Sequence, residues 1–452
     1  GCEKGQTELK SEHIAVEQNQ DLPINLSAYA AAIAFEPVQV ERALRQNSIM
    51  RTWRNSLTRK TKIRENIRIG IPRVLNMFGL APFFMGYFQS LGIPPENIIW
   101  SDYTTDRLYR EGIRRGSIDP CFPSKLCIAH VHNLLENHHK RYALTHIFMP
   151  MIETVPSFLT QTQGCFACPT ATATPESVHA AFRKEGDLFA ASGIRFKKTF
   201  LNLSVPGLCA KQITEDWAKD LLLDAEESYL AVLQGMRALQ NYRSRLRQAG
   251  KRLLNELKEK RKLGIVLLAR PYHNDSGINH GICAEFQRLG YPILTLDSLP
   301  TDLETLEEVF AQDRSRCSQY DPLSIDDVWK NSFSENSSRK IWGAKFVARH
   351  PNLIGLELSN FKCGHDAAIS SVVQDIIEHA GKPFFYFRDI DENKPTGSIR
   401  IRIETIRYFL KKREESLNTP TTGIPLPVVS TSKHSSRQIE LTGEEKLPAS
   451  VS

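Results

Sequence analysis

Short apolar runs that alternate with helical segments limit the folds open to this chain more than any other feature of its sequence. A first series of such runs is IRIGIPRVL (67–75), NIIW (97–100) and HIFMPMI (146–152). A second series is LGIVLLA (263–269), YPILTL (291–296), NLIGLEL (352–358) and KPFFYF (382–387). Strands at this spacing, with helices between them, predict parallel doubly wound sheets. We therefore expect an α/β fold of two Rossmann-like doubly wound parallel-sheet domains joined by a long helical connector.

The connector is predicted from the segment between the two series. Residues 214–262 contain no proline, and their apolar residues recur at helical spacing. We expect one unbroken helix there, and we interpret its Arg- and Lys-rich later half, 237–262, as a solvent face. The predicted units are an N-terminal helical or irregular segment (1–65), a first Rossmann-like domain (66–210) and the connector (211–262). A second Rossmann-like domain (263–414) and a disordered tail (415–452) follow.

Charge and composition restrict the class of protein. The net charge of +7 comes from 58 basic and 51 acidic residues, and part of it lies between Arg42 and Arg64. We interpret this stretch as a solvated helix face, because no zinc-finger or RNA-binding signature interleaves aromatic residues with its charges. No apolar run is long enough for a membrane span, and the first residues are polar. We expect a cytoplasmic protein without nucleic-acid or membrane partners, and the GCEKG start predicts a fragment of a longer chain.

Cysteines give the main indication of chemistry. Cys121, Cys168 and Cys363 each follow an apolar run or begin a helical segment, and the ends of parallel strands meet in one crevice. Thiolates in that position predict an iron-sulfur cluster with one open iron for substrate, whereas a fourth ligand would favour electron carriage. Cys165 and Cys168 form a CxxC pair, which equally fits a redox dithiol or half of a zinc site. Lys125, one helical turn after Cys121, either stabilises an anionic cluster or lies on the surface.

Polar residues beside these turns are weaker candidates. His273, Asn274 and His280 flank a glycine in a strand-to-helix turn, where an anionic substrate group is favoured. His365 and Asp366 follow Cys363 directly, where they would tune a cluster through hydrogen bonds or transfer a proton. His273, His365 and Asp366 are therefore the catalytic candidates. The alternative for every residue of this set is capping a helix and fixing its own loop.

Several longer segments resemble a known family. IGIPRVLNM, CFPSKL, ARPYHNDSGINHGI, DSLP, FVARHPNLIGLELSNFKCGHDA and RDIDENKPTGSIRIRIET are similar to the carboxyl-terminal part of the large acyl-CoA dehydratase activase-related proteins, relatives of the 2-hydroxyglutaryl-CoA dehydratase system. The resemblance implies two Rossmann-like domains around a 4Fe-4S cluster. It selects Cys121, Cys168 and Cys363 as ligands, with Cys165 as the alternative to Cys168.

The same resemblance implies a function and a partner. A separate activator ATPase domain or subunit would supply low-potential electrons for dehydration or reduction of an acyl-CoA or a small molecule. This chain contains neither a GxxxxGK[ST] loop nor a GxGxxG fingerprint, so we expect no ATP site in it. Two alternatives stay open: a non-catalytic electron carrier or scaffold, and a metal-free Rossmann-like binding module.

The predicted tail gives a first test. Removing the residues after Asn418 should leave the melting temperature almost unchanged, because truncating unpacked chain costs little free energy. Thermal unfolding of the truncated and full chains measures this. A loss of more than about 2 kcal/mol would mean that the tail packs on the core.

Overall fold

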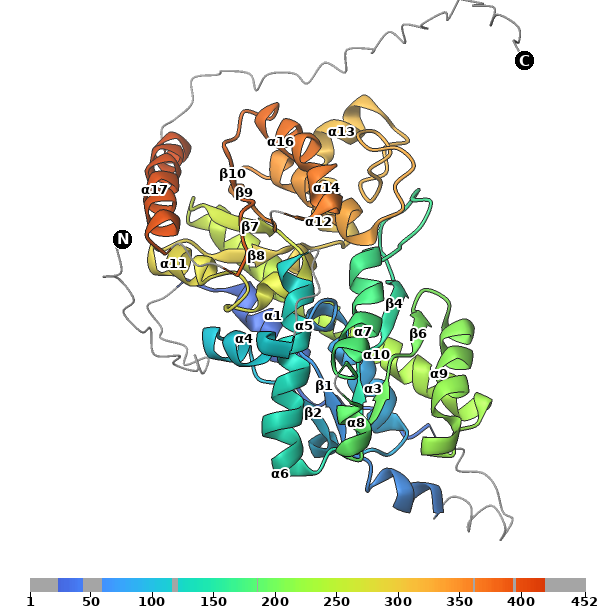
Figure 1. Cartoon of the computed structure of the whole chain (residues 1–452). Coiled ribbons are helices and arrows are strands. Elements are labelled where there is room, and N and C mark those ends of the chain that lie inside the picture. Colours follow the sequence, from blue (N-terminus) through green and yellow to red (C-terminus); the bar gives the residue numbers. More distant parts are fainter. Residues whose placement is uncertain are drawn as a thin grey trace, which may run out of the picture.

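Two all-parallel, four-stranded sheets form the framework of the computed structural model (Figure 1). The structure describes residues 23–43, 59–115, 121–184, 186–360, 362–392 and 396–418. Most of the predicted N-terminal segment, most of the basic stretch from Arg42 to Arg64 and the predicted tail after residue 418 lie outside these ranges.

The first sheet has the strand order β2-β1-β3-β5, and a two-stranded sheet of β4 and β6 extends it. The strands are β1 Ile69–Ile71, β2 Ile98–Trp100, β3 His146–Phe148, β4 Met151–Thr154, β5 Arg195–Lys197 and β6 Phe200–Asn202. The run at 146–152, predicted as one strand, is divided into β3 and β4 around Pro150, which has no N–H to donate to a sheet ladder. Strands β5 and β6 were not predicted.

Helices cover both faces of the first sheet. One apolar cluster packs α3, α9 and α10 on one face, and another packs α5 and α7 on the other. The helices of this half are α3 Met77–Ser90, α4 Asp106–Gly112, α5 Phe122–Asn133, α6 Lys140–Tyr142, α7 Pro169–Ala181, α8 Leu188–Ala191, α9 Pro206–Leu221 and α10 Ala225–Glu259. Between α5 and α6 the chain forms a π-helical turn, Leu134–His139.

The second sheet has the order β10-β9-β7-β8. Its strands are β7 Gly264–Leu268, β8 Ile293–Thr295, β9 Leu353–Leu358 and β10 Phe384–Phe387. Helices α14 and α16 and the end of α10 cover one face, and α1, α11 and α17 cover the other. The helices of this half, with the N-terminal α1, are α1 Leu26–Ala34, α11 Ile282–Arg288, α12 Leu303–Val309, α13 Ala311–Arg316, α14 Glu335–Arg349, α15 Gly364–Ala367, α16 Ser370–Glu378 and α17 Thr396–Asn418. The predicted fold of two Rossmann-like doubly wound sheets is confirmed, and α17 continues into the first residues of the predicted tail.

The connector is two helices, so the prediction of one unbroken helix is wrong. Leu222 adopts a left-handed conformation, with φ of 47°, and ends α9. Asp224 then caps α10, because its side chain accepts the N–H of Glu227 at 2.9 Å. An Asp cap three residues before a Glu is a helix-start signal that apolar periodicity alone overlooks.

Helix α10 holds the two halves of the protein together. It crosses α3 so closely that a Cβ at Gly235 would lie 2.7 Å from the Phe83 carbonyl oxygen. Further along, a Cβ at Gly250 would overlap the Ser298 carbonyl oxygen, which follows β8. The apolar cluster that includes α10 also contains residues of both sheets, among them Ile69 and Ile265. The two sheets therefore share one continuous core.

A buried ion pair fixes the start of α10. The Arg64 side chain is 0% exposed and contacts both carboxylate oxygens of Glu227, at 2.5 and 2.9 Å. Its remaining donors reach the carbonyl oxygens of Leu91, after α3, and Leu221, at the end of α9. One guanidinium group thus joins three helices.

Replacing Glu227 by Gln should lower the free energy of unfolding by about 3 kcal/mol or more, because Arg64 is left as a buried, uncompensated charge. Urea unfolding measures the change. Glu226→Gln, an exposed position in the same turn, is the matched control and should cost less than about 0.5 kcal/mol. Equal losses in the two variants would show that the buried pair carries no special role.

Candidate functional site

The carboxyl ends of the two sheets meet. In each sheet the first strand of the series, β1 or β7, has its successors on opposite sides, which makes the switch point where α/β proteins bind ligands. Beyond these ends, the Thr104 N–H donates to Asp275 Oδ2 at 3.1 Å. A Cβ at Gly277 would lie 2.0 Å from the Thr104 carbonyl oxygen, so only glycine permits this contact.

Each of the three cysteines predicted as ligands immediately precedes a helix at this junction. Cys121 precedes α5, Cys168 precedes α7 and Cys363 precedes α15. All three side chains are half-buried. The first turn of α5 and the second turn of α7 are joined by the hydroxyl groups of Ser124 and Thr174, which lie 3.0 Å apart. Two thiols therefore come from the first half of the chain, and the third from the second half.

The turn after β7 lies within electrostatic reach of all three thiols. Burial opposes the charge of Arg270, but Asp366, Tyr272 and the Cys363 and Cys168 thiols raise its pKa well above the usual value. Burial also raises the pKa of Tyr272, and the Cys363 and Cys121 groups act in the same direction against the lowering effect of Arg270. Arg270 thus interacts electrostatically with the Cys363 and Cys168 thiols, and Tyr272 with the Cys363 and Cys121 thiols.

The other cysteines are placed differently. The Cys165 sulfur lies 2.9 Å from the Ser204 hydroxyl, just beyond β6. Cys127, Cys209 and Cys283 are buried, Cys317 is exposed, and Cys2 lies outside the described residues. Nowhere in the described ranges are three or more His, Cys, Asp or Glu side chains placed to hold a single metal ion.

A buried network of charges holds the Cys363 turn. Asp366 is 2% exposed and accepts bonds from Arg270 at 2.9 Å and from Ser359 at 2.6 Å, and lies 3.0 Å from the Lys340 ammonium group. Lys340 also contacts Glu357 of β9 at 3.2 Å. Although burial alone would raise it, the two cations hold the pKa of Asp366 well below its usual range. Asp366 is therefore ionised and anchors the turn, a contact that suits positioning better than proton transfer.

The two candidate histidines differ in their surroundings. His273 is 1% exposed, and burial lowers its pKa to about 3, so its ring is neutral. Its Nδ1 accepts the Arg270 backbone N–H at 3.2 Å, which places the proton on Nε2. In the described part of the chain this Nε2–H has no acceptor. His365 is half-buried and its Nδ1 lies 3.1 Å from the Ser334 hydroxyl; burial lowers its pKa as well.

The remaining polar candidates tie segments together. Asn274 accepts a hydrogen bond from Ser27 of α1 at 3.0 Å. His280 lies 2.9 Å from a backbone carbonyl oxygen beyond β10. Lys125 donates to Glu392 at 2.9 Å, and thereby joins α5 to the same region. None of these contacts is a helix cap or a bond within the residue's own loop, and Lys125 is buried rather than on the surface. Each residue instead has a structural role in joining two distant segments.

Sequence reasoning overlooked the charges that position the site. Arg270, Lys340 and Glu357 are all at most 5% exposed, and none was singled out. One signal was present, because Glu357 is the only carboxylate within the apolar run at 352–358. A charge in such a strand is tolerated only with a buried partner.

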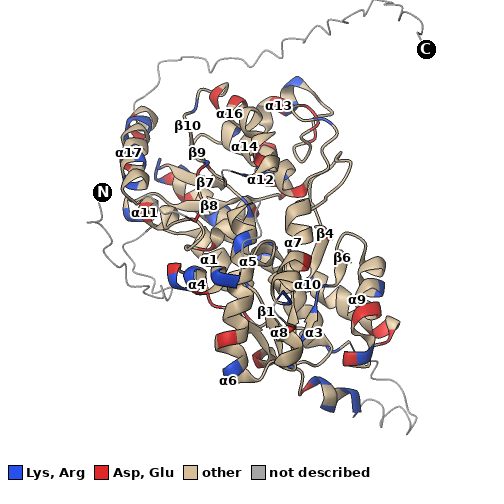
Figure 2. Cartoon of the chain, viewed as in Figure 1, with Lys and Arg blue, Asp and Glu red and all other residues tan. Residues whose placement is uncertain are grey.

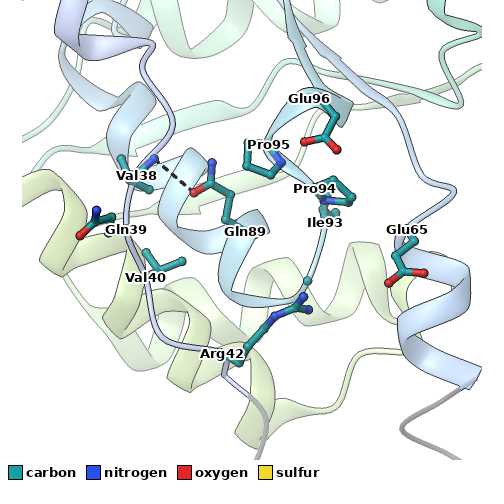
Figure 3. Close-up of a pocket in the computed structure, with 11 residues that line it drawn as sticks. Val38, Gln39, Val40, Arg42, Glu65, Gln89, Ile93, Pro94, Pro95 and Glu96 are labelled. Atoms are coloured by element: carbon teal, nitrogen blue, oxygen red, sulfur yellow. Dashed lines mark hydrogen bonds between the residues drawn. The ribbon is translucent and has the colours of Figure 1, made fainter.

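A separate open pocket lies at the opposite edge of the first sheet. Val38, Arg42, Gln89, Pro94 and Glu96 are among its lining residues (Figure 3). Residues 94–97 precede β2, so the pocket faces the amino end of that strand. No thiol lines it, and ligands of open α/β sheets bind at the carboxyl ends. We therefore place the candidate site at the thiols.

Comparison with known families identifies the chain at a general level. The family model described as "CoA enzyme activase uncharacterised domain" matches residues 68–299, just over half of the 452 residues. The chain belongs to this family. The match to this CoA enzyme activase domain includes the Cys121 and Cys168 turns and Arg270, and ends before Cys363. No curated protein matches the chain.

The surface charge and the helices of this activase-domain chain also bear on the sequence-based expectations. Basic and acidic residues are mixed on outer helices such as α9 and α17 (Figure 2). Among the helices in the described ranges, none is both long and apolar enough to cross a membrane.

The buried charge network around Asp366 predicts that removing a single charge will strongly lower the free energy of unfolding. Asp366→Asn should lower the free energy of unfolding by about 3–5 kcal/mol, because it leaves Arg270 without its buried counterion. Asp375→Asn, the same substitution at an exposed position of α16, should change it by less than about 0.5 kcal/mol. Chemical denaturation measures both. Similar values for the two variants would contradict an anchoring role for Asp366.

Proposed function

We propose that this chain holds a 4Fe-4S cluster through Cys121, Cys168 and Cys363. In this proposal it takes part in ATP-driven low-potential electron transfer for the dehydration or reduction of an acyl-CoA or another small molecule. ATP hydrolysis belongs to a separate activator domain or subunit. The observation that carries the proposal is that Cys121, Cys168 and Cys363 each stand at a helix start, with the first two helices in direct contact. The Arg270 and Tyr272 turn, which lies within electrostatic reach of these thiols, supports it.

The residues at the junction fit such a group. Three cysteines are soft ligands, and a four-iron cluster accepts sulfurs that are further apart than a single ion does. Each thiol is half-buried, which leaves it accessible yet partly shielded from water. The unpartnered, buried Nε atoms of Arg270 and His273 are two donors at the same turn. Cys165, turned toward Ser204, fits less well.

The chain's own groups would hold and tune the site. Thiolates carry negative charge, and Arg270 and Lys340 supply buried positive charge close to Cys363. The neutral His273 ring offers one N–H donor. When bound, a cluster would supply low-potential one-electron chemistry, and the protein's part is to set its potential by charge and hydrogen bonds.

Iron and sulfide measured after strictly anaerobic purification test this proposal. The wild-type chain should contain both, and Cys121→Ser, Cys168→Ser or Cys363→Ser should each lose most of the iron and its visible absorption, because oxygen is a poorer ligand for such clusters. Cys317→Ser, an exposed position, is the control and should keep the wild-type iron content. Cys165→Ser should keep it as well.

Two results would contradict the assignment. Full iron in Cys363→Ser would remove that residue from the ligand set. A wild-type chain that contains neither iron nor sulfide would leave the metal-free binding module as the better function. Turnover with a matched activator and ATP then separates an enzyme component from an electron carrier.

A further inference from the structure

Two arginines on α10 face the interior without a carboxylate partner. Arg243 and Arg247 lie one helical turn apart, and both are half-buried. Within the described ranges no acidic side chain forms an ion pair with either of them, and neither donates a hydrogen bond to protein. The interpretation of residues 237–262 as a solvent face is therefore wrong for these two positions.

The groups around this pair come from three segments. Asp297 follows β8, Glu335 and Arg339 belong to the first turns of α14, and Phe158 follows β4. Arg339 is 5% exposed and contacts Asp297 at 2.5 Å and Glu335 at 3.2 Å. The Arg247 guanidinium carbon lies 5.0 Å from the Phe158 ring centroid.

The charges in this cluster do not balance. Three guanidinium groups face two carboxylates, and Arg339 occupies one oxygen of each carboxylate. Burial lowers the pKa of Arg247 to about 10 and also lowers that of Arg243, although Asp297 acts in the opposite direction. Positive charge is thus held here at a cost in solvation that the protein's own groups do not fully offset.

Buried donors at the same place have no acceptor. The Nε atoms of Arg247 and Arg339 are inaccessible to solvent, and neither has a hydrogen-bond partner in the described part of the chain. Glu335 Oε2 is also buried and unpartnered. Buried polar atoms are usually satisfied, so a group of such atoms around unpaired arginines indicates a missing polar ligand.

We propose that Arg243 and Arg247 form an oxyanion-binding site for a phosphate or carboxylate group of a small ligand. Guanidinium groups bind such oxyanions through paired N–H donors. Two arginines at successive turns of one helix present these donors on the same side. Arg339 contributes a third cation, and its bonds to Asp297 and Glu335 hold it in position.

The start of helix α14 contacts both the oxyanion site and the turn that follows Cys363. Ser334, which immediately precedes α14, lies 3.1 Å from the His365 ring, and Ser337 contacts the His365 carbonyl oxygen. The neighbouring residues Glu335 and Arg339 face α10 instead. The oxyanion site itself does not depend on a cluster.

Binding of simple anions tests the proposal in the full chain. Titration calorimetry with sodium phosphate and with sodium acetate, each against sodium chloride at equal ionic strength, should show binding of at least one oxyanion. Stronger binding of phosphate points to a phosphate ester, and stronger binding of acetate to a carboxylate. In Arg243→Gln/Arg247→Gln the affinity should fall by about tenfold or more, as two charge-assisted contacts are lost.

Arg245→Gln is the matched control. Arg245 lies between the two arginines in sequence, is exposed, and pairs with Glu36 at 3.1 Å on the outside of α10. The Arg245→Gln variant should bind the oxyanion with the affinity of the wild type. Unchanged affinity in the double variant, or no binding of either oxyanion by the wild type, would overturn the site. If the double variant fails to fold, the oxyanion affinity of the single variant Arg243→Gln is measured instead. Unchanged affinity in that variant would overturn the site.

Iron content separates this proposal from the proposed function. The double variant leaves Cys121, Cys168 and Cys363 untouched, so its iron should equal that of the wild type. A wild type without iron would end the cluster proposal and leave the anion titration fully interpretable.

Discussion

The packing of helix α10 against both halves of the chain is the constraint on which the rest of the structure depends. Near its start, the absence of a side chain at Gly235 lets it touch the backbone of α3 at Phe83. Near its end, Gly250 lets it touch the backbone after β8. A straight helix 35 residues long is stiff, so these two contacts fix the distance and orientation between the sheets. The meeting of the two carboxyl edges, where Gly277 lies against Thr104, follows from that placement.

Buried charge then determines the detail of the site. Asp366, Arg270 and Lys340 come from three segments that are far apart in the sequence, and each is nearly inaccessible to water. Such a network adds little net stability compared with an apolar core, but breaking it is costly. It therefore favours one arrangement of the Cys363 turn over alternatives. The arginine cluster is different, because the buried Nε donors of Arg247 and Arg339 have no partner in the described part of the chain.

Much of the fold could be predicted, because buried parallel strands are continuous apolar runs. Strands β1, β2, β7, β8, β9 and β10 all lie within such runs. Strands β5 and β6 could not be found this way, since Arg195–Lys197 and Phe200–Asn202 are short and partly polar. The cysteine turns were predictable because each cysteine stands at the start of a helical segment. Arg270 and Lys340 were not, because a basic residue is normally exposed and only its tertiary partner shows otherwise. For Arg243 and Arg247, the adjacent apolar residues Tyr242 and Leu246 mark a helix face that turns inward, a pattern hidden by the many charges of the segment.

The single core that runs through both sheets has a consequence for how this architecture can evolve. A doubly wound domain usually has its own hydrophobic core and folds alone, so that evolution can exchange or delete one domain while the other still folds. Here the segment before α1 adds a backbone hydrogen bond to the edge strand β8, from the Ile293 N–H to the Ile24 carbonyl oxygen. Helix α1 itself packs on α3 and α10. Neither half can be cut out without exposing apolar surface of the other. Insertions and fusions are therefore tolerated at the surface loops and chain ends, while the pair of sheets is inherited as one indivisible unit.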